Sequence, residues 1–346
     1  MRVLVLNNAA PFIRGGAEEL ADQLVARLNA ISGVEAELLR IPLRSEPAEG
    51  LIEQILLNQS LRLYQVDRVV ALKFPAYLIP HPNKVLWLLH QFRQAYDLYE
   101  AGTSYLCEHP SGARIVQLVR NADRKCFLKC RAIYTNSPVT QRRLLKFNGI
   151  SSTVLYPPLL DPERFRGGQY GSYVFAGGRV GAGKRQHLLV EAMRMVKSDI
   201  RLVVAGPLDD DEYGRKLRGV IDQYGLSSRV ELKFGFHGRD EIARLVNGAL
   251  ACVYIPIDED SMGYVTMEAF CAAKAVLTVK DAGGVLELVR DGATGMVAEP
   301  DPNSIAIGLD RLADLSAARE MGLAARALLE GKSLSWKYTI ERLLDD

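Results

Sequence analysis

The chain has 346 residues, of which 48% are hydrophobic and 24% charged, a balance that excludes disordered and collagen-like proteins. Its 43 basic and 41 acidic side chains give a formal net charge of +2, which argues against a globally basic nucleic-acid-binding protein. No apolar run approaches the roughly 18 residues of a membrane-spanning helix, so we expect a cytoplasmic protein. At roughly 100 to 200 residues per domain, the length favours two domains.

Five cysteines are scattered along the chain without a CxxC pair, which is unlike a disulfide framework and predicts reduced thiols. Cys126 and Cys130 are four residues apart on an expected helix, but no second pair of ligands follows at a useful spacing. We therefore interpret this pair as buried packing. We predict no metal site and no cofactor.

The first part of the chain alternates apolar strand-like runs with helical patterns. The runs RVLVLN, EAELLRI, RVVALK, KVLWLLH and AIYTNSP are separated by expected helices at about 17–31, 51–64 and, for the most part, 96–129. A further helix, VTQRRLLKFNG, follows the last run and closes at Gly149. Such alternation predicts a parallel sheet covered by helices.

A proline-rich segment interrupts this pattern. Pro157, Pro158 and Pro162 fall within six residues, a density that neither a helix nor a central strand tolerates. We place a domain boundary here, with domains at 1–157 and 158–333, because the alternation restarts with YVFAGG and continues to GMVAEP. The chain ends in an amphipathic helix at about 334–346, which we expect to pack back on the first domain.

Positive charge is concentrated between residues 111 and 146. Nine basic side chains stand there against a single acid, Asp123. This stretch is either a solvated helix face or a surface for anionic lipid headgroups or a phosphate-bearing acceptor. The basic residues are Arg114, Arg120, Arg124, Lys125, Lys129, Arg131, Arg142, Arg143 and Lys146.

Two glycine-rich segments follow strand-like runs. Gly15 and Gly16 open the helix GGAEEL, where free backbone amides attract phosphate or a sugar oxygen, although a plain turn explains them as well. The second segment, GGRVGAGKR, nearly spells a phosphate-binding P-loop, but Arg185 stands where that loop needs a hydroxyl for magnesium. What remains is a loop presenting Arg179 and Lys184, which suits a diphosphate without metal help.

Asp260 and Glu268 are eight residues apart, with Gly263 between them and a helix expected from Tyr264. The neighbours of Glu268 are apolar, so we expect its carboxylate to be buried and to need partners. Vicinal hydroxyls of ribose or a hexose donate hydrogen bonds to such a group. The run DDDE at 209–212, by contrast, reads as acidic capping of the next helix.

His90 ends the run KVLWLLH and is followed by Arg93 and Asp97. A histidine at a strand end is often a satisfied core residue. Here the polar cluster points to the carboxyl edge of the first sheet, where ligands of open α/β sheets bind, so we favour a functional role.

Together, these segments resemble the retaining glycosyltransferases of the GT-B fold, in particular family 4 (glycosyl transferases group 1). The resemblance runs in order along nearly the whole chain: GGAEEL, WLLHQF, TNSP, GGRVGAGKR, AGP, the Asp260 to Glu268 spacing, and GGVLELVRDGATGMVAEP. It implies an α/β protein of two Rossmann-like domains whose parallel sheets face each other across a cleft. The acid pair with its trailing glycine segments is the specific part of the match.

The resemblance also implies roles for individual residues. Arg179 and Lys184 match the cations that bind the donor diphosphate, and Glu268 matches the glutamate that holds the nucleotide ribose. The implied catalytic residues are His90, Asp260, Arg179 and Lys184, and Arg93 is a candidate contact to the acceptor. The implied nucleotide-sugar contacts are Gly15, Gly16, Arg179, Lys184, Gly206, Pro207, Gly263, Tyr264, Val265 and Glu268, with the base near Gly206, Pro207 and the loop at 234–238.

One position departs from the family pattern, because Asp260 stands where the family usually has glutamate. The resemblance implies transfer of a hexose from a UDP- or GDP-linked sugar to a sugar or lipid-linked glycan, with retention, without metal and by a front-face mechanism. Its implied partners are therefore the donor, the acceptor and an anionic membrane contacted peripherally, and not nucleic acid. An epimerase of the same fold and a catalytically silent binding subunit are the alternatives.

Overall fold

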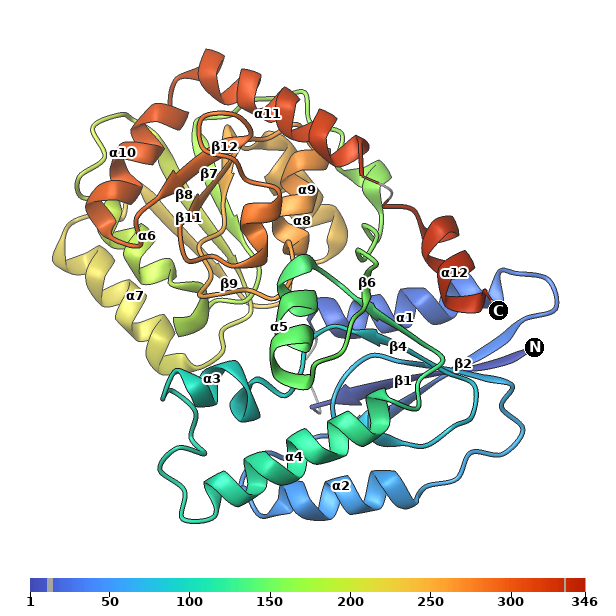
Figure 1. Cartoon of the computed structure of the whole chain (residues 1–346). Helices are drawn as coiled ribbons and strands as arrows, with labels where there is room; N and C mark the ends of the chain where they lie inside the picture. The colour runs from blue at the N-terminus through green and yellow to red at the C-terminus, as the bar shows by residue number, and fades with distance from the viewer. Residues whose placement is uncertain (11–14, 333, 346) are drawn as a thin grey trace. The chain divides into compact units, whose positions relative to one another are not determined.

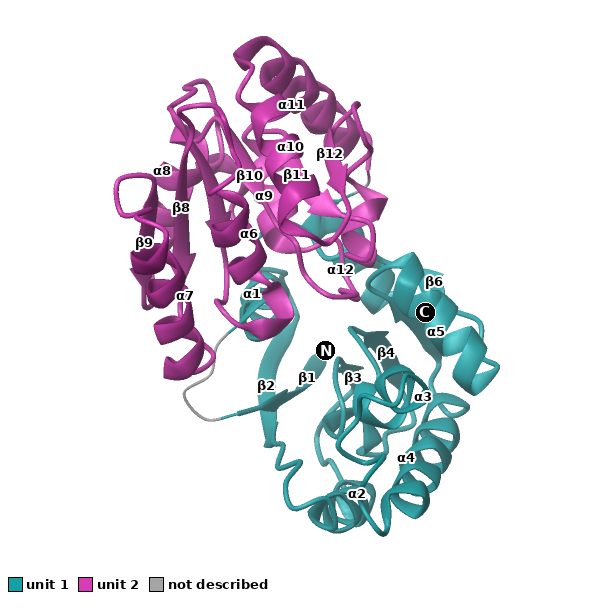
Figure 2. Cartoon of the chain, turned by 90° about the vertical axis from the view of Figure 1, so that its left-hand side faces the viewer, with its two compact units in different colours: residues 1–160, 334–346 teal, residues 161–333 magenta. Residues whose placement is uncertain are grey.

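Two parallel sheets organise the chain. The computed structural model describes residues 1–10, 15–332 and 334–345, and it divides into unit 1 (residues 1–160 and 334–346) and unit 2 (residues 161–333), coloured separately in Figure 2. The division falls in the predicted proline-rich segment. Among the described residues, each unit contains six parallel strands with helices between them, so the predicted α/β class is confirmed. Within the described residues, none of the helices has the length and apolarity needed to cross a membrane.

The sheet of unit 1 has the strand order β2-β1-β3-β4-β5-β6, and every neighbouring pair is parallel. The direction in which successive strands are added to the sheet reverses here, so β1 and β3 are neighbours although β2 separates them in sequence. The strands are β1 (Arg2–Ala9), β2 (Glu35–Pro42), β3 (Arg68–Ala71), β4 (Lys84–Leu88), β5 (Ala132–Thr135) and β6 (Thr153–Val154).

Helices cover both faces of this sheet (Figure 1). Leu51 of α2 and Ile115 of α4 share one apolar core, whereas Leu24 of α1 and Leu343 of α12 share the other. The C-terminal helix therefore packs on unit 1, and the indole of Trp336 donates a hydrogen bond to the Leu159 carbonyl at 3.1 Å. The helices are α1 (Gly16–Asn29), α2 (Gly50–Ser60), α3 (Asp97–Glu100), α4 (Gly112–Phe127), α5 (Pro138–Asn148) and α12 (Trp336–Leu344), with short 3-10 turns η1 (Ala76–Leu78) and η2 (Arg93–Ala95).

The segment 96–129 is less helical than the sequence pattern predicts. A single helical turn, α3, ends before Gly102, whose φ of +71° is left-handed. Helix α4 then begins only at Gly112, two residues after Pro110. Glycine and proline thus limit the helix to the part of the segment with a continuous apolar face.

The sheet of unit 2 has the order β12-β11-β10-β7-β8-β9 and is also parallel throughout. The chain proceeds outward from β7 to β9 and then crosses to β10, so the topological switch lies between β7 and β10. The strands are β7 (Tyr173–Gly177), β8 (Arg201–Gly206), β9 (Val230–Phe234), β10 (Ala251–Val253), β11 (Val276–Val279) and β12 (Gly295–Ala298).

Two helical layers pack on this second sheet. Helices α10, α6 and α7 are neighbours in one layer, and α8, α9 and α11 are neighbours in the other. Ligands of open α/β sheets bind at the carboxyl ends of the strands beside the switch point, which makes the loops after β7 and β10 the place to examine. The helices are α6 (Gln186–Ala192), α7 (Asp211–Gln223), α8 (Arg239–Gly248), α9 (Tyr264–Cys271), α10 (Pro302–Leu312) and α11 (Leu315–Glu330), with 3-10 turns η3 (Pro162–Arg164), η4 (Ala182–Lys184) and η5 (Gly284–Glu287).

Candidate functional site

Lys184 ends the turn η4 after β7, and its ammonium meets side chains from the loop after β10. It pairs with the carboxylate of Glu259 and donates a hydrogen bond to the hydroxyl of Tyr254 at 2.9 Å. That hydroxyl in turn donates to Glu259 at 2.9 Å. Burial and the Glu259 carboxylate raise the pKa of Tyr254, so the phenol stays protonated. The two strands at the switch point thus contribute one cation and its counter-charge.

Arg179 also follows β7, and its guanidinium lies 3.4 Å from the carboxylate of Asp209, after β8. Both side chains are more than one-third exposed, so this ion pair is accessible to solvent and contributes little to stability. The predicted helix cap is confirmed for Asp210, which accepts a hydrogen bond from the Tyr213 amide at 2.6 Å. Asp209 therefore pairs with Arg179, whereas Asp210 caps α7.

The chain passes very close to itself between these two strand ends. Gly206 has a φ of +152°, and a Cβ atom there would lie 1.9 Å from the Gly178 carbonyl oxygen. A Cβ on Gly178 would in turn meet the Val265 side chain at 3.3 Å. These approaches bring the ends of β7 and β8 and the first turn of α9 together.

Glu268 lies inside α9 and is 4% exposed, which confirms the predicted burial. One of its carboxylate oxygens accepts a hydrogen bond from Arg239 at 2.6 Å, and its second oxygen has no hydrogen-bond partner among the described residues. Arg239 binds Asp161 on its other side. Burial raises the pKa of Glu268, and the Arg239 guanidinium opposes that shift. Although burial disfavours its charge, the two carboxylates raise the pKa of Arg239.

Asp260 lies in the loop between β10 and α9 and is 8% exposed. The backbone of this loop packs against Gly283 and Gly284, where a Cβ atom would come within about 2.5 Å of the carbonyl oxygens of Glu259 and Ser261. The trailing glycine pair of the sequence motif therefore fixes the path of the acidic loop.

Gly263 precedes α9 and has a φ of +75°. A Cβ atom there would lie 2.6 Å from the ring of Tyr254. Glycine is thus required both by the left-handed backbone and by the tyrosine that contacts Lys184. The helix that starts here carries Tyr264, Val265 and Glu268, all from the predicted site.

Arg185, at the position where a P-loop has its hydroxyl, is 7% exposed and left-handed, with a φ of +56°. Its guanidinium makes two hydrogen bonds to Asp281, at 2.7 and 2.8 Å. It also donates to the carbonyls of Ile255 and Pro256, at 3.0 and 2.6 Å. All of these contacts are internal, so Arg185 holds the loops after β10 and β11 together.

Pro207 directly follows β8 in unit 2, and the remaining predicted residues lie in unit 1. Gly15 caps α1, and its amide donates to the Glu18 carboxylate at 2.9 Å. His90 follows β4, and its Nδ1 lies 2.7 Å from the Gln91 carbonyl oxygen. Arg93 pairs with Asp97 at 2.6 Å. The Arg93 guanidinium, which was predicted to contact an acceptor, is therefore already bound to Asp97 through some of its N–H groups.

The basic stretch divides into anchored and exposed side chains. Arg120 donates to the Ala95 carbonyl at 2.8 Å and lies over the ring of Tyr96, and Arg143 lies 3.5 Å from Asp97. The exposed ones lie on α4, on α5 or beside them, together with the exposed leucines Leu128 and Leu145. The exposed basic residues are Arg114, Arg124, Lys125, Lys129, Arg131, Arg142 and Lys146.

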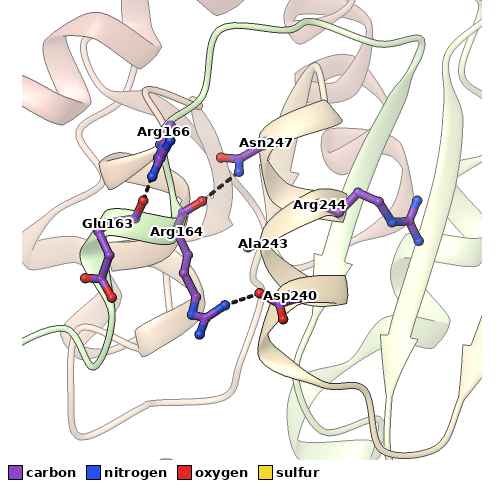
Figure 3. Close-up of a pocket in the computed structure, with 7 residues that line it drawn as sticks. All are labelled: Glu163, Arg164, Arg166, Asp240, Ala243, Arg244 and Asn247. Atoms are coloured by element: carbon purple, nitrogen blue, oxygen red, sulfur yellow. Dashed lines mark hydrogen bonds and ion pairs between the residues drawn. The ribbon is translucent and has the colours of Figure 1, made fainter.

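A pocket of about 480 Å³ lies elsewhere in unit 2, between η3 and α8. Figure 3 shows Arg164 reaching Asp240 across it, while Arg244 points away along the other side of the helix. Arg164 also pairs with Asp161 at 2.8 Å, the residue that binds Arg239. None of the predicted site residues lines this pocket, but its wall continues the series of ion pairs that ends at Glu268.

Unit 2 therefore gathers Arg179, Lys184, Gly206 and the start of α9 at one sheet edge. The sequence reasoning missed five partners, each of which holds one of the predicted residues or its partner: Asp209, Glu259, Tyr254, Arg239 and Asp161. The expected burial of Glu268 was a signal that a cation was needed nearby. No signal in the sequence selected Arg239 among the other arginines.

Residues 169–327, which form most of unit 2, match the family described as Glycosyl transferases group 1. The match covers 159 of the chain's 346 residues, so this region is similar to the glycosyl transferases group 1. The recognition made from the sequence motifs is confirmed at this level.

Relatives of known function agree with the family. The alpha-maltose-1-phosphate synthase of Mycobacterium tuberculosis is 25% identical over 100% of this chain and 98% of its own length. The enzyme of the same name from Mycolicibacterium smegmatis is 29% identical, but that match covers 57% of this chain and 54% of the relative.

The fold is shown by a solved structure. The Anabaena protein HepE, crystallised in complex with UDP-glucose, superposes with a TM-score of 0.73 at 16% identity, covering 99% of this chain and 98% of HepE. The chain therefore has the GT-B fold, as its motifs predicted.

Proposed function

We propose that this protein is a retaining glycosyltransferase that transfers a hexose from a UDP- or GDP-linked donor to a sugar or lipid-linked glycan. The observation that carries the proposal is the pairing at the switch point of unit 2. There, Lys184 and Arg179 follow β7, and each faces a carboxylate from a neighbouring strand end. A diphosphate has enough negatively charged oxygens to bind both cations in place of the two carboxylates, and ligands of such sheets bind at this edge.

Glu268 supports a nucleoside as the other half of the donor. Arg239 occupies one carboxylate oxygen and keeps the group in place, and the second oxygen is left to accept from a ribose hydroxyl. The amides at the start of α9, beside Gly263, Tyr264 and Val265, favour the phosphates. The complex of HepE with UDP-glucose favours UDP as the first nucleotide to test.

The transfer step follows from these charges. The bond between the anomeric carbon and the diphosphate oxygen breaks while the acceptor oxygen bonds to the same face of the carbon. The leaving diphosphate takes the acceptor's proton, and Lys184 and Arg179 stabilise the charge that develops on it. We assign Asp260 and His90 to the donor sugar. Because aspartate is one methylene shorter than glutamate, the hydrogen bond of Asp260 to the sugar is shifted. The contact of His90 to the Gln91 carbonyl fixes the tautomer of the imidazole, with its proton on Nδ1.

The acceptor is assigned to unit 1. Its exposed basic side chains favour an anionic acceptor or an anionic membrane that carries the acceptor. The name of the alpha-maltose-1-phosphate synthases makes a sugar phosphate the first soluble acceptor to test, with Arg93 as its candidate contact. Gly15 and Gly16, at the start of α1, are assigned to the donor.

Calorimetric titration with UDP, GDP and ADP tests the donor site in the full chain. Glu268→Ala removes the ribose contact and is expected to weaken nucleotide binding roughly 10- to 100-fold, since it deletes a charge-assisted hydrogen bond. Glu320→Ala, on the exposed face of α11, is the matched control and keeps the affinity. Unchanged binding by Glu268→Ala would remove Glu268 from the site.

Product analysis then separates the reaction classes. A transferase consumes donor only in proportion to the glycosylated acceptor, or slowly by hydrolysis, and keeps the anomeric configuration. Conversion of the nucleotide sugar to an isomer without acceptor would identify an epimerase instead. Nucleotide binding without either reaction, across a panel of sugar phosphates and lipid-linked glycans, would identify a silent subunit.

Membrane contact has its own test, in which sedimentation with vesicles containing phosphatidylserine measures binding. Charge reversal at Arg124, Lys125, Lys129 and Arg131 is expected to abolish binding, and salt is expected to weaken the wild type. These positions are preferable to Arg120 and Arg143, whose contacts are internal. Vesicle binding that changes neither with salt nor with charge reversal would reject the proposed membrane contact.

A further inference from the structure

Lys84 begins β4, and its side chain is buried in unit 1 with an exposed fraction of only 2%. Its ammonium donates hydrogen bonds to the carbonyls of Tyr77 and Ile79, each at 2.8 Å. Its third contact is the sulfur of Cys126 on α4, at 3.3 Å. These three acceptors use all three protons of the ammonium.

No carboxylate among the described residues pairs with Lys84. Asp123, one turn before Cys126, is also buried, but its carboxylate accepts from the Tyr96 hydroxyl at 2.8 Å. A buried ammonium is costly unless a counter-charge lies beside it. Among the described residues that contact Lys84, Cys126 is the one able to supply a counter-charge. Its thiol donates to the Tyr77 carbonyl at 3.0 Å, and loss of that proton would leave a thiolate beside the ammonium.

Cys130 supplies the second sulfur. It follows the end of α4, where the chain leaves the helix at Leu128, and its thiol lies 3.5 Å from the Cys126 carbonyl oxygen. A hydrogen bond from the Cys130 thiol and the charge of Lys84 lower the pKa of Cys126 to about 7, against the effect of burial. The same hydrogen bond raises the pKa of Cys130. One sulfur of the pair is thus favoured as a thiolate and the other as a thiol.

We propose that Cys126 and Cys130 form a peroxide-reactive dithiol, in which Lys84 stabilises the Cys126 thiolate and Cys130 closes a disulfide after oxidation. This inference concerns the core of unit 1 and does not depend on the proposed transferase activity. It replaces the interpretation of the pair as packing alone.

Both steps balance with a hydroperoxide as the oxidant. The Cys126 thiolate attacks the peroxide oxygen, the O–O bond breaks, and sulfenic acid forms with release of hydroxide. The Cys130 thiol then attacks the sulfenic sulfur, a disulfide forms, and water leaves. The two sulfurs give up two electrons, and the peroxide takes them.

Trypsin gives a direct assay on the full chain treated with hydrogen peroxide at pH 7. Cleavage after Lys125, Lys129 and Arg131 places the two cysteines on separate peptides, CFLK and CR. We expect these peptides to be linked after oxidation, without prior reduction, and to separate after dithiothreitol. We also expect Cys126 to react before Cys107, which is exposed but has no such lysine.

Two variants test the assigned roles. Cys130→Ser is expected to stop linkage and to leave a sulfenic acid on Cys126 that dimedone traps. Lys84→Met is expected to slow oxidation of Cys126 about tenfold, because an ordinary thiol is only a few per cent ionised at pH 7. Cys107→Ser is the control and keeps the linkage.

The proposal is overturned if Cys107 is oxidised first and the linked peptides are absent from the wild type. It is also overturned if Cys130→Ser gives no dimedone adduct on Cys126, a result that does not depend on how Lys84→Met folds.

Discussion

The ammonium of Lys184 is paired with the carboxylate of Glu259, which comes from the opposite side of the topological switch in unit 2. Both side chains are about one-quarter exposed, so a ligand is able to reach them. In the proposed donor site, an incoming diphosphate would compete with Glu259 for this cation. This competition makes the two residues distinguishable by mutation.

Lys184→Ala is expected to weaken binding of UDP or GDP roughly 10- to 100-fold, because a charge-assisted contact to the diphosphate is lost. Glu259→Gln is expected to strengthen binding by about two- to fivefold, because the amide keeps the hydrogen bond but competes less for the ammonium. Titration calorimetry at low and moderate salt measures both. If Glu259→Gln weakened binding as much as Lys184→Ala, the carboxylate would instead be holding the lysine in its binding position.

Arg185 is expected to act on stability. Arg185→Ala leaves the carbonyls of Ile255 and Pro256 and the carboxylate of Asp281 without their donor, which we expect to cost unit 2 about 2 kcal/mol. Both tryptophans, Trp87 and Trp336, lie in unit 1, so hydrogen exchange of unit 2 peptides is the suitable measurement. Faster exchange is expected in the peptides after β10 and β11.

Arg185→Ser provides a second comparison at the same position, because it completes the P-loop signature G-x-x-x-x-G-K-S. We expect no magnesium-dependent ATP hydrolysis from this variant or from the wild type, since the residue in this fold braces two loops. Hydrolysis that appears with serine and disappears with alanine would contradict that interpretation.

The strands and the type of fold could be read from the sequence because short apolar runs and intervening helices determine a parallel sheet locally. The burial of Glu268 was also predictable, since its neighbours along the helix are apolar. Its partner was not, because Arg239 lies 29 residues away and reaches Glu268 only through the packing of α8 beside α9. Lys184 and Glu259, 75 residues apart, meet only once β10 lies beside β7.

The acids in DDDE show the same limit at shorter range. Capping by Asp210 follows from local helix geometry, and the sequence predicted it. The contact between Asp209 and Arg179 depends instead on the neighbouring positions of β7 and β8. Local rules therefore assigned one of two adjacent aspartates and missed the other.

Gly206 is expected to tolerate no side chain. Gly206→Ala places a Cβ atom 1.9 Å from the Gly178 carbonyl oxygen at a φ of +152°, so the ends of β7 and β8 must separate at a cost of roughly 2 kcal/mol or more. Nucleotide affinity is expected to fall as well, because Arg179 follows Gly178. Gly219→Ala is the control: its Cβ meets nothing within 4 Å inside α7, and it is expected to stabilise unit 2 by about 1 kcal/mol. Calorimetric unfolding compares the two variants.

Asp123 is expected to make the stability of unit 1 depend on pH. Burial raises its pKa well above the ordinary value, against the opposing hydrogen bond from Tyr96. Between the unfolded and the folded pKa, the folded state binds more protons than the unfolded state, so the stability contribution is greatest at low pH and falls as pH rises through the folded pKa.

Asp123→Asn keeps an acceptor for Tyr96 and removes this titration. Urea unfolding followed by tryptophan fluorescence reports on unit 1 alone, and we expect wild type to lose more stability than Asp123→Asn between pH 5 and 8. Glu37→Gln, exposed on β2, is the control that keeps the wild-type slope, and equal slopes for wild type and Asp123→Asn would show that Asp123 does not exchange its proton in this range.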